Sequence, residues 1–274
     1  MGTEGTAMEF DTILYEVEER TAVITFNRPD QLNAISPHMA FELRRAYAAA
    51  EADEEVWTLL ITANGRAFCT GADVSEIPDD GRVIYEEPYL STYPQWEAPQ
   101  EATPPFRTMT KPIITAVNGL CCGAGLDLVT CGDIAIASER AEFFDPHVSI
   151  GLVSGREMVR LARVLPTGIA MRVALTGRHE RMSAQRAYEL GMISEVVEHD
   201  RLLDRAKEVS ALVNRNAPLA VRGTRLAIRR GLDLPMHEAE ILAETFRERV
   251  VRTDDAKEGP LAFTEKRAPK WTGT

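Results

Sequence analysis

Several features that would place this protein in well-known classes are missing from its sequence. Its 274 residues contain no run of about 18 apolar residues, the length that a membrane-spanning helix needs. Its four cysteines show neither C-x-x-C spacing nor the Cys/His spacing of zinc sites (Cys69, Cys121, Cys122 and Cys131). We therefore expect reduced thiols, no metal site, no membrane partner and a cytoplasmic location.

An excess of positive charge is also lacking. Lys and Arg total 31 against 42 Asp and Glu, which gives a formal net charge of -11. Such a chain is poorly suited to the phosphate backbone of nucleic acids, so no nucleic-acid partner is expected. A small anionic ligand remains compatible with this charge, because a local site can differ in sign from the whole surface.

Disorder is not expected for most of the chain, because 45% of its residues are hydrophobic. Residues 1–9 are the exception. They are rich in Gly and Thr and have neither the basic nor the apolar segment of a signal peptide, so they are predicted to form a short disordered tail. We expect one core over 10–200 and a helical region over 201–274.

Short β-rich segments alternate with helical ones in the first half of the chain. Runs typical of strands occupy residues 21–27, 56–62, 113–118 and 133–138. Ser36-Pro37 has the composition of a helix start, with a capping serine and a proline in the first turn. This alternation predicts an α/β core in layers. After Gly155 apolar residues recur at helical spacing, and the core or other subunits must cover these stripes.

Prolines and aromatic residues crowd the segment 78–110, where their density forbids one long helix. We interpret this segment as an insertion in the core rather than as a second domain. Two hypotheses remain open for it: an irregular surface loop, or a lid that shapes a binding pocket.

Two glycine-rich segments, 66–73 and 118–127, each follow a predicted strand. Gly123-x-Gly125 fits the first two glycines of a dinucleotide fingerprint, but Leu128 stands where the third is required, so this interpretation is rejected. What remains is a predicted helix start with outward-pointing N–H groups. Such a start suits an anion, including a transient one.

Two acid/base side chains accompany these segments. Asp127 lies in the first turn of the predicted helix, where it either complements the helix dipole or takes part in chemistry. His147 follows a proline and is therefore expected on a loop. The remaining histidines lie in polar or helical contexts and are expected on the surface (His38, His179, His199 and His237).

Taken in order, these segments resemble the crotonase superfamily, also called the enoyl-CoA hydratase/isomerase superfamily, over roughly residues 10–269. The matching motifs are Asn27-Arg28-Pro29, Leu32-Asn33-Ala34, residues 68–73, Ala116-Val117-Asn118-Gly119, Gly123-Ala124-Gly125, Cys131-Gly132-Asp133-Ile134, residues 187–191 and residues 263–267. The resemblance implies an α/β spiral of ββα units with a C-terminal helical region that forms trimers or dimers of trimers. It implies an acyl-CoA substrate, in which CoA is part of the substrate and not a separate cofactor.

The same resemblance assigns roles to single residues. Thr70 and Ala124 would supply the backbone N–H groups that stabilise a thioester enolate, and one such donor is worth about 3 kcal/mol. The positions that match CoA-binding positions of the family are Arg28, Asn33, Ala34, Ala72, Asp73 and Val74, with Phe263 and Lys266 reaching the CoA of a neighbouring subunit.

The two acid/base positions depart from the family pattern. Hydratases of the family use two glutamates, whereas this chain has Asp127 and His147. Aspartate is shorter by one methylene, about 1.5 Å, and a misplacement of that order costs about 100-fold in rate unless something compensates. Histidine remains a competent acid or base. Either Asp145 or Glu142 is close enough in sequence to orient its imidazole.

We expect hydration or isomerisation of an enoyl-CoA, with Asp127 and His147 sharing the proton transfers. Two alternatives stay open. One is another reaction of the family, such as thioester hydrolysis, decarboxylation or carbon–carbon cleavage, with His147 as the base. The other is an acyl-CoA-binding protein that has kept the pocket and lost efficient chemistry.

Overall fold

The computed structural model describes residues 9–73, 75 and 109–274. The predicted insertion over 78–110 lies outside these residues except at its last two positions, and Val74 and most of the predicted N-terminal tail also lie outside them.

Six strands form the larger sheet, in the spatial order β1-β2-β3-β5-β7-β10. They are β1 (Ile13–Glu18), β2 (Thr21–Phe26), β3 (Thr58–Ala63), β5 (Ile113–Val117), β7 (Ile134–Ser138) and β10 (Glu195–Val197). The pair β1–β2 is antiparallel and every later pair is parallel. The four strands predicted from the sequence are confirmed as β2, β3, β5 and β7.

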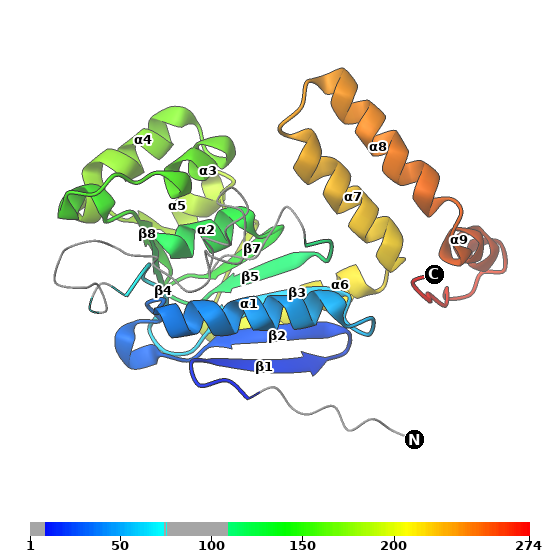
Figure 1. Ribbon diagram of the computed structural model, residues 1–274, viewed down its shortest axis with the longest axis horizontal. Coiled ribbons are helices and arrows are strands. Elements are labelled where there is room, and N and C mark those ends of the chain that lie inside the picture. The colour runs from blue at the N-terminus through cyan, green and yellow to red at the C-terminus, as the bar shows by residue number, and fades with distance from the viewer. Residues whose placement is uncertain (1–8, 74, 76–108) are drawn as a thin grey trace, which may run out of the picture.

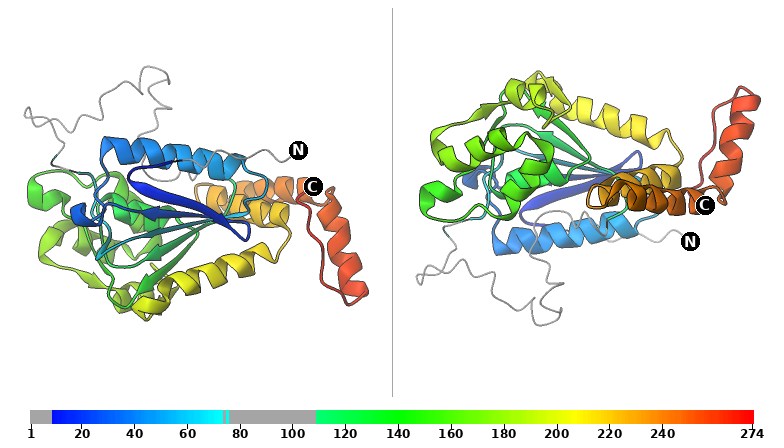
Figure 2. Two further views of the ribbon diagram at one scale, coloured as in Figure 1. Left: turned by 90° about the horizontal axis from the view of Figure 1, so that it is seen from below. Right: turned by 90° about the horizontal axis from the view of Figure 1, so that it is seen from above.

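Helices cover both faces of this sheet, which explains why β3 and β5 are buried along their whole length. α1 (Pro37–Ala52) lies on one face and α6 (Leu202–Asn214) on the other (Figure 2). The predicted start of α1 is confirmed, because the Ser36 hydroxyl accepts a hydrogen bond from the N–H of Met39 at 3.1 Å. α1 buries Met39 and Leu43 in the main core, and α6 buries Leu202 in a second cluster against the sheet.

A smaller sheet of four short strands runs in the order β4-β6-β8-β9. Its members are β4 (Ala67–Cys69), β6 (Leu120–Cys122), β8 (Glu142–Phe144) and β9 (Met182–Ser183). Each of the first three directly follows a strand of the larger sheet, and these three are mutually parallel. Because parallel strands end at the same edge of a sheet, the turns after β4, β6 and β8 are brought side by side.

The helices α2 (Ala124–Cys131), α3 (Arg156–Val164), α4 (Thr167–Thr176) and α5 (Ala184–Glu189) gather at the end of the molecule where the smaller sheet lies (Figure 1). The start of α2 after the glycine-rich turn is confirmed, and the side chain of Ser183 caps α5 by accepting from the N–H of Arg186. In the described part of the chain no helix combines the length and apolarity needed to cross a membrane.

The last three helices extend away from the body (Figures 1 and 2). α7 (Pro218–Gly231) and α8 (Met236–Val250) form an antiparallel pair, and α9 (Asp254–Thr264) lies beyond them. Ion pairs from Arg225 and Arg229 to Asp133, at 2.6 and 2.8 Å, tie α7 to the core. The predicted apolar stripes are present here but lie open in the single chain, since α8 has no buried residue.

Candidate active site

The turns after β4 and β6 touch each other through two glycines. Gly71 has a φ of +91° and Gly123 a φ of +54°, and residues with a side chain rarely adopt such positive values. A Cβ atom on Gly123 would lie only 3.2 Å from the Cα of Gly71. The absence of both side chains therefore lets the two turns pack backbone against backbone.

This contact brings together the two positions predicted to supply N–H donors. Ala124 is the first residue of α2, so its N–H has no acceptor within the helix. A Cβ placed on Gly71 would lie 3.7 Å from the nitrogen of Ala124. Thr70 directly precedes Gly71, and its hydroxyl donates to the carbonyl of Leu32 at 3.2 Å, which fixes the turn. The backbones of Thr70 and Ala124 thus lie on adjoining turns.

His147 begins a short 3₁₀ turn, η4 (His147–Ile150), after β8. Its Nδ1 lies 2.8 Å from a carboxylate oxygen of the fully buried Asp145, so we assign the Nδ1 proton to this hydrogen bond, which leaves Nε2 for a ligand. The ring carbon Cε1 is 3.8 Å from the position that a Cβ of Gly123 would take. The imidazole is 25% exposed and lies beside the turn that carries Ala124.

The structure decides which acidic residue orients this imidazole. Asp145 contacts it, whereas the carboxylate of Glu142 pairs with Arg181 at 2.7 Å. The hydrogen bond to Asp145 raises the pKa of His147 above its ordinary value, and the charge of Asp127 contributes in the same direction. A protonated imidazole is therefore favoured at this position.

Asp127 lies in the first turn of α2, as the sequence predicts, and is fully buried. Its Oδ2 is 3.0 Å from Nε of Arg156 and 2.9 Å from Nη1 of Arg160, both on α3. Within the described residues its Oδ1 has no hydrogen-bond partner. Burial raises the pKa of this carboxyl, and the two guanidinium charges oppose that rise. Sequence reasoning missed both arginines, because nothing local shows that α3 packs on α2.

Thiol chemistry is disfavoured in this region. Cys69, Cys121 and Cys122 are free and buried, and they flank the two glycine turns. Burial raises the pKa of Cys69 and of Cys122 to about 12. Their thiols stay protonated at neutral pH and are weak nucleophiles.

Four of the predicted CoA-binding residues form one cluster beside Gly71. Arg28 donates to the carbonyl of Ala34 at 2.6 Å, and its guanidinium lies 3.0 Å from the carboxylate of Asp73. The N–H of Arg28 donates to the side chain of Asn33 at 2.9 Å. A hydrogen bond from Ser75, together with the charge of Arg28, lowers the pKa of Asp73 against the opposing effect of burial. Arg28 and Asp73 therefore form a charged pair that joins the turn after β2 to the turn after β4.

Asn33 and Ala72 differ in what they can offer a ligand. The Asn33 side chain is fully buried, and its amide donates to the carbonyls of Asn64 and Ala67 at 2.9 and 2.8 Å. It shapes the turn from inside. Ala72 is exposed and pairs through its backbone with Ile35.

Phe263 and Lys266 are not brought to this cluster within one chain. They lie at the end of α9, on the opposite side of the molecule from β4 and α2 (Figures 1 and 2). The Phe263 side chain is 87% exposed.

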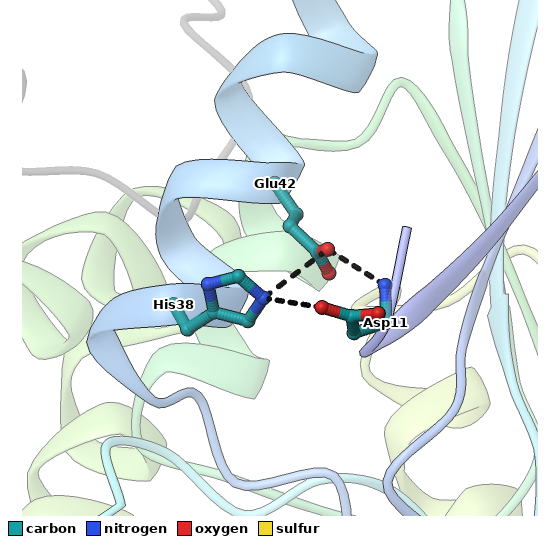
Figure 3. A group of neighbouring side chains, drawn as sticks. All are labelled: Asp11, His38 and Glu42. Atoms are coloured by element: carbon teal, nitrogen blue, oxygen red, sulfur yellow. Dashed lines mark hydrogen bonds and ion pairs between the residues drawn. The ribbon is translucent and has the colours of Figure 1, made fainter. Parts of the chain in front are cut away.

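A second group of polar side chains lies at the start of α1. The carboxylate and imidazole atoms of Asp11, His38 and Glu42 lie within 4.8 Å of one another (Figure 3). The Glu42 carboxylate also accepts from the N–H groups of Asp11 and Thr12, at 2.7 and 2.9 Å. These contacts anchor the segment that leads into β1 onto α1, so this group has a structural role.

The chain is similar to known proteins over nearly its whole length. A family model described as enoyl-CoA hydratase/isomerase matches residues 16–274. (E)-Benzylidenesuccinyl-CoA hydratase of Thauera aromatica is 32% identical over 263 residues, which cover 95% of this chain and 99% of that protein. Mevalonyl-coenzyme A hydratase of Aspergillus fumigatus is 35% identical over 253 residues, which cover 91% and 90%.

The fold is similar to solved structures as well. A crystal structure of an enoyl-CoA hydratase/isomerase from Mycobacterium paratuberculosis has a TM-score of 0.93 and 72% sequence identity to this chain. The match covers 97% of this chain and 100% of that one. The α/β fold of the family with its C-terminal helices, which the resemblance implies, is confirmed, and it contains two mixed sheets.

Proposed function

This chain belongs to the enoyl-CoA hydratase/isomerase family, and we propose that it hydrates an enoyl-CoA with Asp127 and His147 as its acid/base pair. The observation that supports this best is the place of His147. Its imidazole is oriented by Asp145 and lies beside the turn of Gly123, the residue that precedes Ala124. A side chain that can donate a proton thus lies close to the turn that carries a predicted backbone N–H donor.

In the proposed reaction the thioester oxygen binds between the N–H groups of Thr70 and Ala124. Negative charge grows on this oxygen as the enolate forms. Fixed donors then stabilise the transition state more than the ground state, and removing one donor of this kind costs about 100- to 1,000-fold in rate.

The proton transfers follow from the two side chains. Oδ1 of Asp127 accepts a proton from water, whose oxygen forms a bond to Cβ of the substrate. The electron pair of the double bond moves toward Cα and the thioester oxygen, and Nε2 of His147 then protonates Cα. One water is added in total, and proton exchange with solvent restores both groups. Asp127 must be ionised and His147 protonated at the start.

CoA would lie along the cluster of Arg28, Asp73 and Ala72. The guanidinium of Arg28 would bind a phosphate while it also pairs with the carboxylate of Asp73. Phe263 and Lys266 would come from a neighbouring subunit in a trimer or a dimer of trimers, since both lie far from the site within their own chain. Val74 belongs to the same proposal by motif position.

The first prediction tests the acid/base pair. Asp127→Asn and His147→Ala should each lower kcat about 100- to 10,000-fold with enoyl-CoA substrates, because each removes one proton-transfer group. Binding of acyl-CoA, measured by calorimetry, should change little. His237→Ala is the matched control, since His237 is exposed on α8.

Product masses distinguish this proposal from other reactions of the family. A gain in mass of one water supports hydration. Free CoA would indicate thioester hydrolysis, loss of carbon dioxide would indicate decarboxylation, and a cleaved carbon chain would indicate carbon–carbon cleavage. Isomerisation leaves the mass unchanged and is seen by chromatography. Wild-type rates in both variants would contradict the assigned roles of Asp127 and His147.

A further inference from the structure

We propose that Arg156 and Arg160 position Asp127, holding it as an ionised carboxylate that presents only its Oδ1 to the reacting water. This inference rests on the proposed function, because it assigns to α3 a role in the same proton transfer. The two arginines are positioning residues, since they act on the substrate through Asp127.

The first argument is burial. Asp127 is fully buried, and an isolated carboxylate in such a place favours its neutral form. A neutral Asp127 could not accept a proton from water. The two guanidinium groups at 3.0 and 2.9 Å supply the charge that keeps the ionised form accessible near neutral pH.

The second argument is geometry. Arg156 and Arg160 are four residues apart on α3, so both side chains project from one face of that helix. Both contact Oδ2 of Asp127, while Oδ1 is buried and lacks a hydrogen-bond partner in the described structure. A buried acceptor without a partner indicates a place for a donor from water or substrate. The contacts on Oδ2 therefore determine which oxygen takes the proton.

The third argument concerns the charges around Asp127. On α3, Glu157 raises the pKa of Asp127 through its charge, in the same direction as burial. On the other side, the charges of Asp127 and Glu157 act on His147, whose imidazole pairs with Asp145. The arginines are the cations that oppose both burial and Glu157.

The arginines also account for the short side chain at this position. Aspartate reaches about 1.5 Å less far than glutamate and has one torsion angle fewer. Two guanidinium contacts on one oxygen restrict the two side-chain torsions of Asp127. A short carboxylate held in one orientation by α3 replaces a longer and freer one.

The test is the pH dependence of kcat/KM. Arg160→Gln removes one cation, so the pKa of Asp127 should rise and the acid limb of the profile should move up by about one pH unit. We expect kcat/KM at neutral pH to fall about 10- to 100-fold, because Asp127 loses both charge stabilisation and its fixed orientation. Arg160→Lys keeps the charge and should restore the position of the limb. Arg156→Gln, at a more exposed site, should shift the acid limb in the same direction by a smaller amount. It replaces Arg160→Gln in the test if that variant does not fold.

Two controls separate positioning from a general effect on the fold. Arg163→Gln alters an exposed arginine of the same helix, which pairs with Asp233 at 3.6 Å, and should leave the profile unchanged. In an Asp127→Asn background, Arg160→Gln should change kcat/KM less than about twofold, because the group that it acts on is already gone. An equal loss in both backgrounds, or an unmoved acid limb in folded Arg160→Gln and Arg156→Gln, would overturn the inference.

A measurement without substrate keeps this test independent of the proposed function. The infrared band of a protonated carboxyl, taken as wild type minus Asp127→Asn, reports the titration of Asp127 directly. We expect this titration at higher pH in Arg160→Gln than in wild type. If enoyl-CoA substrates are not converted but the titration shifts, the proposed function fails and the positioning role stands. If they are converted and the titration does not shift, only the positioning role fails.

Discussion

At the scale of single residues, the candidate site is distinguished by the pairing of His147 with the buried Asp145. A carboxylate bonded to Nδ1 fixes the ring, fixes the tautomer and raises the pKa of the imidazole. Asp127, by contrast, sits under two guanidinium groups. The pKa of His147 is raised by its carboxylate partner, whereas burial raises the pKa of Asp127 and the two guanidinium charges oppose that rise. The proposed addition of water needs His147 protonated and Asp127 ionised.

The pH profile of hydration follows from this pairing. His147 must be protonated, so kcat/KM should fall as pH rises through the pKa of His147, which lies above the ordinary value near 6.5. A reaction that uses neutral His147 as a base would instead gain rate over the same range. A profile of kcat/KM against pH distinguishes the two, and a rise through that range would contradict hydration by this route.

Asp145→Asn tests the origin of the raised pKa. An amide carries no charge and bonds less strongly to imidazolium, so the pKa of His147 should drop and the alkaline limb should move to lower pH. We expect kcat/KM to fall about 10- to 100-fold. Glu142→Gln is the matched control, because Glu142 pairs with Arg181 and not with His147. An alkaline limb that stays in place in Asp145→Asn would assign it to another group.

The residues of the site differ in how far sequence alone could identify them. Asp127, His147 and the two glycine turns lie in local motifs and could be named. Arg156 and Arg160 could not, because their role depends on α3 lying against α2. The fully buried state of Asn33 was also out of reach, since its amide donates to residues about thirty positions away.

At the scale of elements, the turns after β4 and β6 carry the predicted N–H donors, and Gly123 is their critical position. Gly123→Ala would place a Cβ 3.2 Å from the Gly71 backbone at a φ of +54°. We expect the turns to separate, with kcat/KM reduced about 100-fold or more. Gly151→Ala is a fitting control: its φ is +78°, yet nothing lies within 4 Å of the added carbon.

In that control, backbone strain of about 1 to 2 kcal/mol should lower stability while the rate stays near wild type. Thermal unfolding and kinetics measured on the same samples separate these effects. If both alanine variants lose stability and neither loses activity, the contact between the turns is not what holds the donors.

Strong local signals explain which elements were predictable. The strands β2, β3, β5 and β7 have five or six residues, long enough for their apolar patterns to show. The strands of the smaller sheet have only two or three residues, and so short a run carries no period. The site lies at the ends of just these short strands, so its assembly could be inferred only through the family resemblance.

At the scale of the whole molecule, the C-terminal helices leave apolar side chains open to solvent. The large apolar residues that are more than half exposed on or beside α7, α8 and α9 are Ile228, Leu232, Met236, Ile241, Val251, Leu261 and Phe263. A surface of this kind indicates contact with another protein. Because α9 lies far from the candidate site of its own chain, the proposed roles of Phe263 and Lys266 in CoA binding require a neighbouring subunit.

Lys266→Glu tests that arrangement. If Lys266 meets the nucleotide phosphates of CoA, charge reversal should raise KM for acyl-CoA about tenfold through lost attraction and added repulsion. It should not affect an acyl-pantetheine, which lacks the nucleotide. Lys270→Glu, also exposed near the C-terminus, makes the same change in net charge. If both variants raised KM equally, the effect would come from the net charge of the protein, which is -11 in the wild type, and not from a contact between Lys266 and CoA.

The central claim, that this chain adds water to an enoyl-CoA through Asp127 and His147, is tested most directly by following heavy oxygen from labelled water. The wild-type protein should convert a short-chain enoyl-CoA to a hydroxyacyl-CoA with one label at Cβ and an intact thioester, and His147→Ala should form almost none. Label in a free carboxylic acid released with CoA, or an equal yield from His147→Ala, would contradict the account.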